Sequence, residues 1–243
     1  MLSYAPGDSF AHGLDARSKL TFQVGFAVAV FANPTPRWLA AMVVVAAASL
    51  AGARVSPLAV VWSLRLVLAF LALSPLVAAV TVGPPWLVPA RAVDSALAVS
   101  RVVLVLFVSA AYVRTTPVRA TRAAVQRYVP GKAGRLLGAG MALTLRFLPL
   151  LRRDLLAVRE AMHARGGQRR SVVDRTRRVG LVGLSRAFER ADRLSVALRA
   201  RCFSWNPTPP PASFAPADAL VTVAGAALAL AGLWWSVAGV LPH

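Results

Sequence analysis

Long apolar stretches constrain this chain more than any other feature of its sequence. A helix that crosses about 30 Å of hydrocarbon needs about 20 mostly apolar residues. Five stretches are apolar with few charges, at about residues 20–36, 38–53, 58–82, 92–113 and 217–240. The last three are long enough to span a bilayer, whereas the first two are short and could be short spans or a shielded hairpin. We therefore predict an all-α, polytopic integral membrane protein with about five transmembrane helices.

The distribution of charge predicts how the chain is divided. Of the 243 residues 57% are hydrophobic, yet the formal net charge is +19. Residues 114–203 contain 21 of the 28 Lys and Arg but five of the nine Asp and Glu, so they hold +16 of that charge. Because Lys and Arg near spans are retained in the cytosol, we expect a membrane region (1–113), a basic cytosolic region (114–206) and a Pro-rich hinge with a final span (207–243). The N-terminus would be cytosolic and the C-terminus outside.

Three charged residues lie within expected spans. Arg65 falls in the third span, and Asp94 and Arg101 share one face of the fourth, seven residues apart. Charges at such depth face a protein interior or find partners. Both a structural ion-pairing or snorkelling role and a transport role remain open for them.

Apolar residues spaced by three and four predict amphipathic helices in the basic region. They run at about 139–165 and 172–201, after a shorter helix at about 117–128. Pro149 is expected to kink the first long helix, and Gly166-Gly167 to end it. Glu189, four residues before Arg193, is expected to support the second as an ion pair.

Two arginines differ from the others by their position. Arg165 and Arg201 each stand at the C-terminal end of an expected helix, where the backbone carbonyls favour a cation. Both arginines are flanked by small residues, namely Ala164, Gly166, Ala200 and Cys202. Such residues would let the backbone of a partner come close to the guanidinium group.

Motifs for catalysis or for metal binding are not evident in the sequence. Gly131-Lys132-Ala133 lacks the spacing and the hydroxyl residue of a phosphate-binding loop. The histidines (His12, His163 and His243) are isolated, and Cys202 is the single cysteine. The first ten residues do not resemble a signal peptide. We expect no catalytic residue, no metal site and no cofactor bound by this chain.

Several motifs resemble the transmembrane T component of energy-coupling factor (ECF) transporters. Residues 14–20, Leu-Asp-Ala-Arg-Ser-Lys-Leu, are similar to the family's opening motif, with Ala16 in place of its proline. Thr115-Thr116-Pro117 resembles the start of its coupling region, and residues 145–149, Leu-Arg-Phe-Leu-Pro, resemble a stretch within that region. The words Ala164-Arg165-Gly166 and Ala200-Arg201-Cys202 resemble its paired Ala-Arg-Gly signatures, with Cys202 replacing glycine.

This resemblance implies a non-catalytic subunit of an importer in the plasma membrane of a bacterium or archaeon. In the family, the two signature arginines, here Arg165 and Arg201, dock into two ABC-type ATPase subunits, which bind ATP and Mg²⁺. Arg146, Phe147 and Pro149 would be structural residues of the coupling helices. The chain would transmit ATP-driven motion to a substrate-binding S component that imports a vitamin or a metal ion.

The residues leave one alternative of another class open. A membrane-tethered basic module could bind anionic lipid or nucleic acid through many arginines. Such binding would be salt-sensitive and would depend little on Arg165 or Arg201. In the transporter interpretation, membrane lipid is a partner and nucleic acid is not. An intramembrane enzyme is disfavoured, because the expected spans contain no plausible catalytic set.

Overall fold

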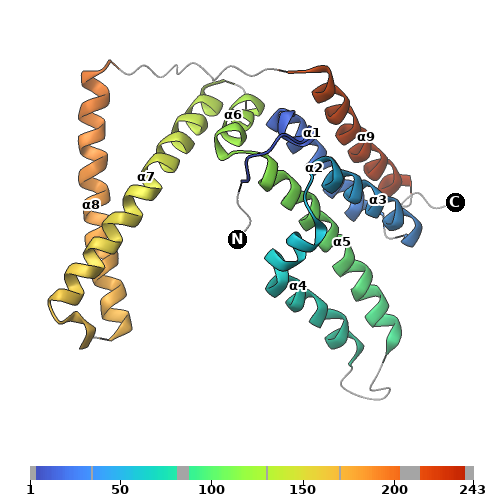
Figure 1. The fold of residues 1–243 in the computed structure, drawn as a ribbon, viewed down its shortest axis with the longest axis horizontal. Coiled ribbons are helices and arrows are strands. Elements are labelled where there is room, and N and C mark those ends of the chain that lie inside the picture. The colour runs from blue at the N-terminus through green and yellow to red at the C-terminus, as the bar shows by residue number, and fades with distance from the viewer. Residues whose placement is uncertain are drawn as a thin grey trace. The chain divides into compact units, whose positions relative to one another are not determined.

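The computed structural model describes residues 4–33, 35–80, 88–129, 131–169, 171–202 and 214–238, and its elements are helices (Figure 1). The helices are α1 (Phe10–Gly13), α2 (Ala16–Ala32), α3 (Pro36–Gly52), α4 (Pro57–Ala79), α5 (Pro89–Thr115), α6 (Val118–Tyr128), α7 (Gly131–Ala164), α8 (Val172–Ala200) and α9 (Pro216–Ala238), with a 3₁₀ turn η1 (Gly167–Arg169). The prediction of an all-α fold is confirmed. The chain forms two compact units: Met1–Ala124 with Pro211–His243, and Val125–Pro210.

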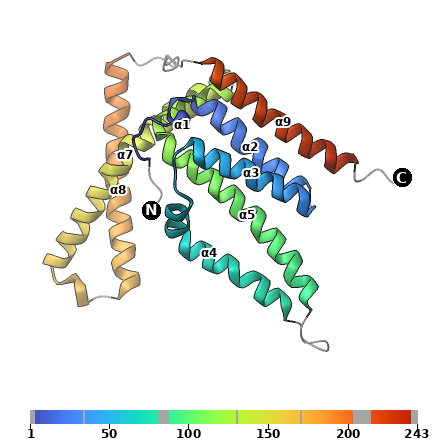
Figure 2. The ribbon, with the colours of Figure 1, turned by 45° about the vertical axis from the view of Figure 1, so that its right-hand side comes forward.

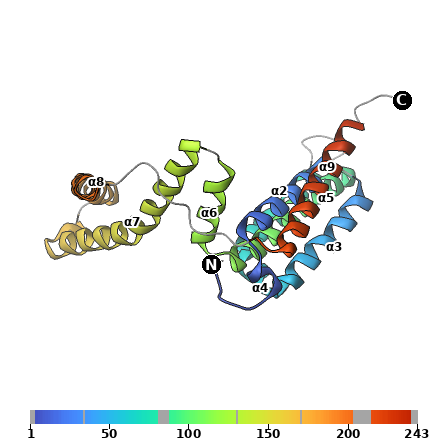
Figure 3. The same cartoon turned by 90° about the horizontal axis from the view of Figure 1, so that it is seen from above.

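The first unit is a helical bundle in which the two ends of the chain meet. Helix α9 packs along α2, and α5 contacts α2, α3 and α4 (Figures 2 and 3). One core cluster joins α2, α3 and α5 through buried apolar side chains: Phe26, Ala29, Val30, Met42, Ala46, Leu104 and Val108. A second cluster surrounds Val60 where α4 begins, next to the ends of α3 and α5.

Glycines bring α2 and α9 into backbone contact. A Cβ atom on Gly225 would lie 2.6 Å from Phe22 Cα, and one on Gly232 would lie 2.8 Å from Ala29 Cα. A Cβ on Gly25 would overlap the carbonyl group of Gly225. Small residues at an interface allow two helices in a membrane to approach this closely.

Helix length and composition separate the expected spans into two groups. Helices α4, α5 and α9 are apolar enough and long enough to cross a membrane, in agreement with the expected spans at 58–82, 92–113 and 217–240. Helices α2 and α3 have 17 residues each, about 26 Å at 1.5 Å per residue, which is shorter than the hydrocarbon core. A break between them is present, but it lies a few residues earlier than the expected boundary at Arg37, since α2 ends at Ala32 and α3 begins at Pro36. The end of the expected third span, residues 81–82, and the Pro-rich hinge at Pro207–Pro211 lie outside the described residues.

Helix α7 differs from what the charge pattern predicted. At 34 residues it begins eight residues before the expected start at 139, and it also meets the length and hydropathy criteria for a span. Arg146 divides its apolar residues into two short runs, neither of which reaches the length of a span. By length and composition, the described part of the chain therefore has four membrane-length helices, one of them in the basic region.

Large apolar side chains cover the outside of the first unit. Leu66 and Phe70 on α4 are 79% and 76% exposed, and Trp234 on α9 is 76% exposed. The Arg65 guanidinium lies over the Trp62 ring, 5.0 Å from its centroid. Exposed apolar surface of this extent is typical of helices that face lipid.

Candidate functional site

Helices α7 and α8 form an antiparallel pair in the second unit (Figure 1). Their lengths of 34 and 29 residues correspond to about 51 and 44 Å. The Ser171 hydroxyl caps α8 by accepting a hydrogen bond of 3.2 Å from the backbone N–H of Asp174. The short connection between Ala164 and Val172 joins the two helices at one end of the pair.

The two helices are held together by a close contact and an ion pair. Gly183 of α8 faces Leu155 of α7, whose Cδ2 would lie 2.5 Å from a Cβ on that glycine. Nearby, Arg190 Nη1 approaches Asp154 Oδ2 to 2.7 Å, with side-chain exposures of 31% and 20%. The two atoms are not aligned as hydrogen-bond donor and acceptor, so the attraction is that of an ion pair.

The sequence predicted a weaker pair and missed this one. Glu189 and Arg193 do approach to 3.6 Å within α8, as expected, but both are mostly exposed. Exposed pairs of this kind stabilise a helix by a few tenths of a kcal/mol. The pair between Asp154 and Arg190 joins residues 36 positions apart, and helical spacing carries no signal for it.

The two arginine words have the same local structure. In the first, the Arg165 N–H donates to Ala161 O and the next N–H, of Gly166, donates to His163 O. In the second, the Arg201 N–H donates to Ala197 O and the next N–H, of Cys202, donates to Arg199 O. Gly166 (φ +71°) and Cys202 (φ +49°) both adopt the left-handed conformation that ends a helix. The expected helix end at Gly166 is thus confirmed.

Each word presents its arginine outward. The six residues Ala164, Arg165, Gly166, Ala200, Arg201 and Cys202 are all exposed. Among the described residues, neither guanidinium lies within ion-pair distance of a carboxylate. These arginines are therefore accessible in the isolated chain.

The words lie at opposite ends of the antiparallel pair. Arg165 follows the end of α7, close in sequence to the start of α8, whereas Arg201 caps the other end of α8. The length of α8 places them about 44 Å apart. The structure therefore does not bring the two arginines together; they lie on two separate turns with similar backbone geometry.

The residues of the Arg-Phe-Leu-Pro stretch lie within α7, well before its end at Ala164. Arg146 and Pro149 are exposed and Phe147 is half-buried. Arg146 precedes Arg165 by 19 residues, about 28 Å along the helix. Helix α7 continues through Pro149, and the kink expected there stays a prediction.

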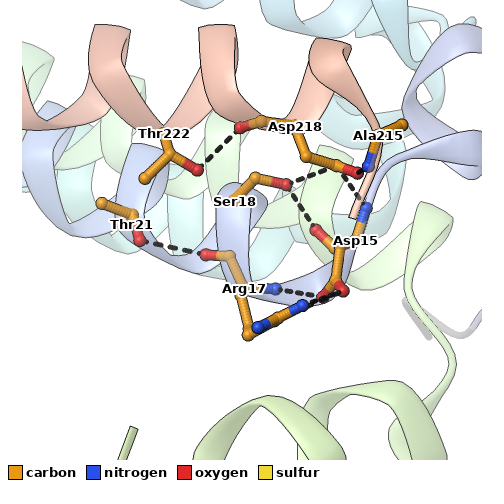
Figure 4. A network of polar contacts seen from close by, with 7 residues as sticks. All are labelled: Asp15, Arg17, Ser18, Thr21, Ala215, Asp218 and Thr222. Atoms are coloured by element: carbon orange, nitrogen blue, oxygen red, sulfur yellow. Dashed lines mark hydrogen bonds and ion pairs between the residues drawn. The ribbon is translucent and has the colours of Figure 1, made fainter. Parts of the chain in front are cut away.

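The opening motif forms a polar network in the first unit (Figure 4). Asp15 caps α2 by accepting a 2.9 Å hydrogen bond from the Arg17 N–H, and its carboxylate also binds the Arg17 guanidinium at 2.9 Å. Burial alone would raise the pKa of Asp15, but the hydrogen bonds from Arg17 and the charges of Arg17 and Lys19 outweigh it and lower the pKa.

Asp218 of α9 is the centre of this network. Its side chain is 1% exposed, and Oδ1 accepts hydrogen bonds from the Asp15 N–H at 2.6 Å and the Ser18 hydroxyl at 2.9 Å. Oδ2 accepts a third from the Ala215 N–H at 2.8 Å. A buried carboxylate that accepts three hydrogen bonds is compensated for its loss of water. Sequence reasoning missed Asp218; the signal was a lone carboxylate at the start of an apolar helix.

Lys19 ties the opening motif to a second motif. Its ammonium group donates to the carbonyl of Thr115, at 3.2 Å, where α5 ends and Thr115-Thr116-Pro117 begins. Lys19 is 9% exposed, and burial lowers its pKa from 10.5 to about 8, against the opposing pull of Asp218 and Asp15. The structure thus brings together two stretches that the sequence singled out separately.

Within the described ranges, no group of three or more His, Cys, Asp and Glu side chains is arranged to hold a metal ion. His12 hydrogen-bonds to Ser9 and to the Ala5 carbonyl. His243 lies outside the described residues.

An all-α polytopic bundle with a basic pair of long helices is the architecture that these observations define. A family model for CbiQ, described as cobalt transport protein, matches residues 7–210. Since this match covers well over half of the sequence, the chain belongs to the CbiQ family. The resemblance to ECF T components is thus confirmed at the level of the family.

Two relatives support this assignment. The chain is 29% identical over 132 residues to the energy-coupling factor transporter transmembrane protein EcfT of Thermotoga maritima, covering 50% of this chain and 49% of that one. It is 31% identical over 223 residues to a Bifidobacterium longum protein that carries the name of an ABC transporter ATP-binding protein. That match covers 83% of this chain and 28% of the relative. The chain therefore spans about half of one relative and less than a third of the other.

Proposed function

We propose that this chain joins two ATP-binding subunits, at Arg165 and Arg201, to a substrate-binding S component, and that the assembly imports a vitamin or a metal ion. The observation that carries the proposal is the repeated turn: two exposed arginines with the same backbone geometry, about 44 Å apart on one helix pair. Two equivalent contacts suit two copies of a similar partner.

The chemistry of each turn suits a protein groove. A guanidinium is planar and always charged, and it presents several donors to carbonyl or carboxylate acceptors. The neighbouring Ala and Gly or Cys leave room for a partner's backbone. Arginines at the centre of an interface often contribute 2 kcal/mol or more to binding, an order-of-magnitude expectation for each turn.

The relatives support ATP-binding partners. The Bifidobacterium longum relative is named as an ATP-binding protein, and the stretch like this chain is 28% of it. An ATP-binding part in the same polypeptide would place both functions in one assembly. ATP and Mg²⁺ would then be bound by the partners and not by this chain.

Movement of the coupling helices would connect the partners. When the ATP-binding subunits close, the two arginine turns would be displaced, and α7 and α8, which contact each other at Asp154 and Arg190, would move with them. With residues 114–206 in the cytosol, this motion would reach the S component through the membrane bundle.

Co-purification tests the proposal. The double variant Arg165→Ala/Arg201→Ala should lose the ATP-binding subunits and ATP-driven uptake of Co²⁺, Ni²⁺ or a vitamin from a tested panel. The matched control Arg159→Ala/Arg199→Ala removes the same charge from exposed positions on the same helices and should retain both. Full association of the double variant would contradict the proposal, and equal losses in both variants would favour the polyanion-binding alternative.

A further inference from the structure

The chain leaves the first unit and returns to it through two short segments. It leaves within α6, which follows Thr115-Thr116-Pro117 and belongs to the first unit as far as Ala124, and the first unit resumes at Pro211, before α9. The second unit, Val125–Pro210, lies between these points in the sequence. A force that passes along the chain from the coupling helices therefore enters the membrane bundle either through α6 and Thr115-Thr116-Pro117 or through Ala215 and α9.

Both routes contact the same short stretch of the chain, residues 15–19, through three of its residues. Lys19 donates to the Thr115 carbonyl, which belongs to the outgoing segment. The Asp15 N–H and the Ser18 hydroxyl donate to Asp218, whose other oxygen accepts from the Ala215 N–H of the returning segment. Figure 4 shows Asp218 reaching from α9 to this stretch of α2.

The groups that make these contacts are shielded from water. Lys19, Thr115 and Asp218 are 9%, 2% and 1% exposed, and Ser18 is fully buried. Charge-assisted hydrogen bonds in a low-dielectric setting are stronger than exposed ones. Removing one partner leaves the other polar group buried without a hydrogen bond, which destabilises the fold. The backbone contact between α2 and α9 at Gly25, Gly225 and Gly232 adds rigidity on the same side of the bundle.

We infer that residues 15–19 and Asp218 form a mechanical clamp through which both ends of the coupling region act on the bundle as one body. Asp218 is the principal positioning residue. With the clamp closed, displacement of either segment moves α2, α5 and α9 together. With it open, the same displacement moves the start of α9 alone, and ATP hydrolysis is no longer converted into motion of the bundle. The coupling part of this inference rests on the proposed function.

Amide hydrogen exchange on the isolated full chain in detergent micelles tests the clamp without any partner. Asp218→Ala should accelerate exchange in the first turns of α9 by about tenfold or more, the range expected for loss of charge-assisted hydrogen bonds. Asp218→Asn, which retains one acceptor oxygen, should have a smaller effect. Thr222→Val is the matched control, because the Thr222 hydroxyl donates only within α9, to the Asp218 carbonyl. Unchanged exchange in Asp218→Ala would overturn the clamp.

The complex with co-purified ATP-binding subunits, in lipid nanodiscs, tests the coupling. In the wild type and in Thr222→Val, ATP with vanadate should change exchange in α2 and α9 as well as in α7 and α8. In Asp218→Ala the change should stay in α7 and α8, with ATP hydrolysis within about twofold of the wild type. A wild-type response in Asp218→Ala, or a parallel loss of hydrolysis and complex yield, would overturn the inference. Failure of the wild-type chain to retain the subunits would instead contradict the proposed function.

Discussion

The ion pair between Asp154 and Arg190 gives a prediction about the coupling helices that can be worked out quantitatively. At an effective dielectric constant of about 20, unit charges about 4 Å apart attract each other by about 4 kcal/mol. Partial desolvation and the ordering of two long side chains oppose most of this gain. The side chains are 31% and 20% exposed, so the pair should exceed the 0.2–1 kcal/mol of exposed pairs. We expect a coupling energy of about 1–2 kcal/mol.

A double-mutant cycle measures this energy. Asp154→Asn, Arg190→Gln and the double variant would be compared by the free energy of opening of α8, obtained from amide exchange around Leu184–Phe188. The exposed pair between Glu189 and Arg193 (60% and 82% exposed) provides the control, with an expected coupling of a few tenths of a kcal/mol. A coupling energy below about 0.3 kcal/mol for Asp154 and Arg190 would refute the reasoning.

Three further predictions follow from single sites. The pKa of Lys19 falls from 10.5 to about 8 on folding. Because the unfolded chain then binds more protons between these pH values, the free energy of unfolding should rise from about pH 8 to 10.5, by about 3 kcal/mol in all. Lys19→Met should abolish this rise in thermal unfolding measured against pH, and an unchanged profile would refute the prediction. Gly225→Val places atoms against the α2 backbone near Phe22 and should destabilise the bundle by about 3 kcal/mol; a thermal midpoint within error of the wild type would contradict the close packing. Cys202→Gly removes the strain of a non-glycine residue in the left-handed conformation, and it should slow amide exchange in the last turn of α8 by an amount equivalent to about 0.5–1 kcal/mol. Gly166→Ala introduces the same strain at the end of α7 and should accelerate exchange there.

Features that depend on local sequence were predictable. Apolar spacing located α8, and the glycine after Arg165 located the end of α7, because both signals lie within a few residues of the element that they determine. The start of α7 was missed because its regular apolar spacing begins only near Met141, ten residues after the helix begins at Gly131. In the structure Gly134 and Gly138 allow close contact with Val129 and Gln126, a tertiary contact that periodicity does not predict.

Features that depend on long-range contacts were not predictable. Asp218 binds Ser18 across 200 positions and Asp15 across 203, and the crossing of α7 and α8 depends on how two helices approach each other. The two arginine words were predictable in part. Their sequence predicted two exposed helix ends, but only the structure gives their shared backbone turn and their separation along α8.

The central claim is that Arg165 and Arg201 each hold one ATP-binding subunit. Native mass spectrometry of the purified assembly measures this directly, by counting ATP-binding subunits per copy of this chain. The account predicts two subunits for the wild type and for Arg159→Ala/Arg199→Ala, and none for Arg165→Ala/Arg201→Ala. Two subunits retained by the Arg165→Ala/Arg201→Ala variant would contradict it.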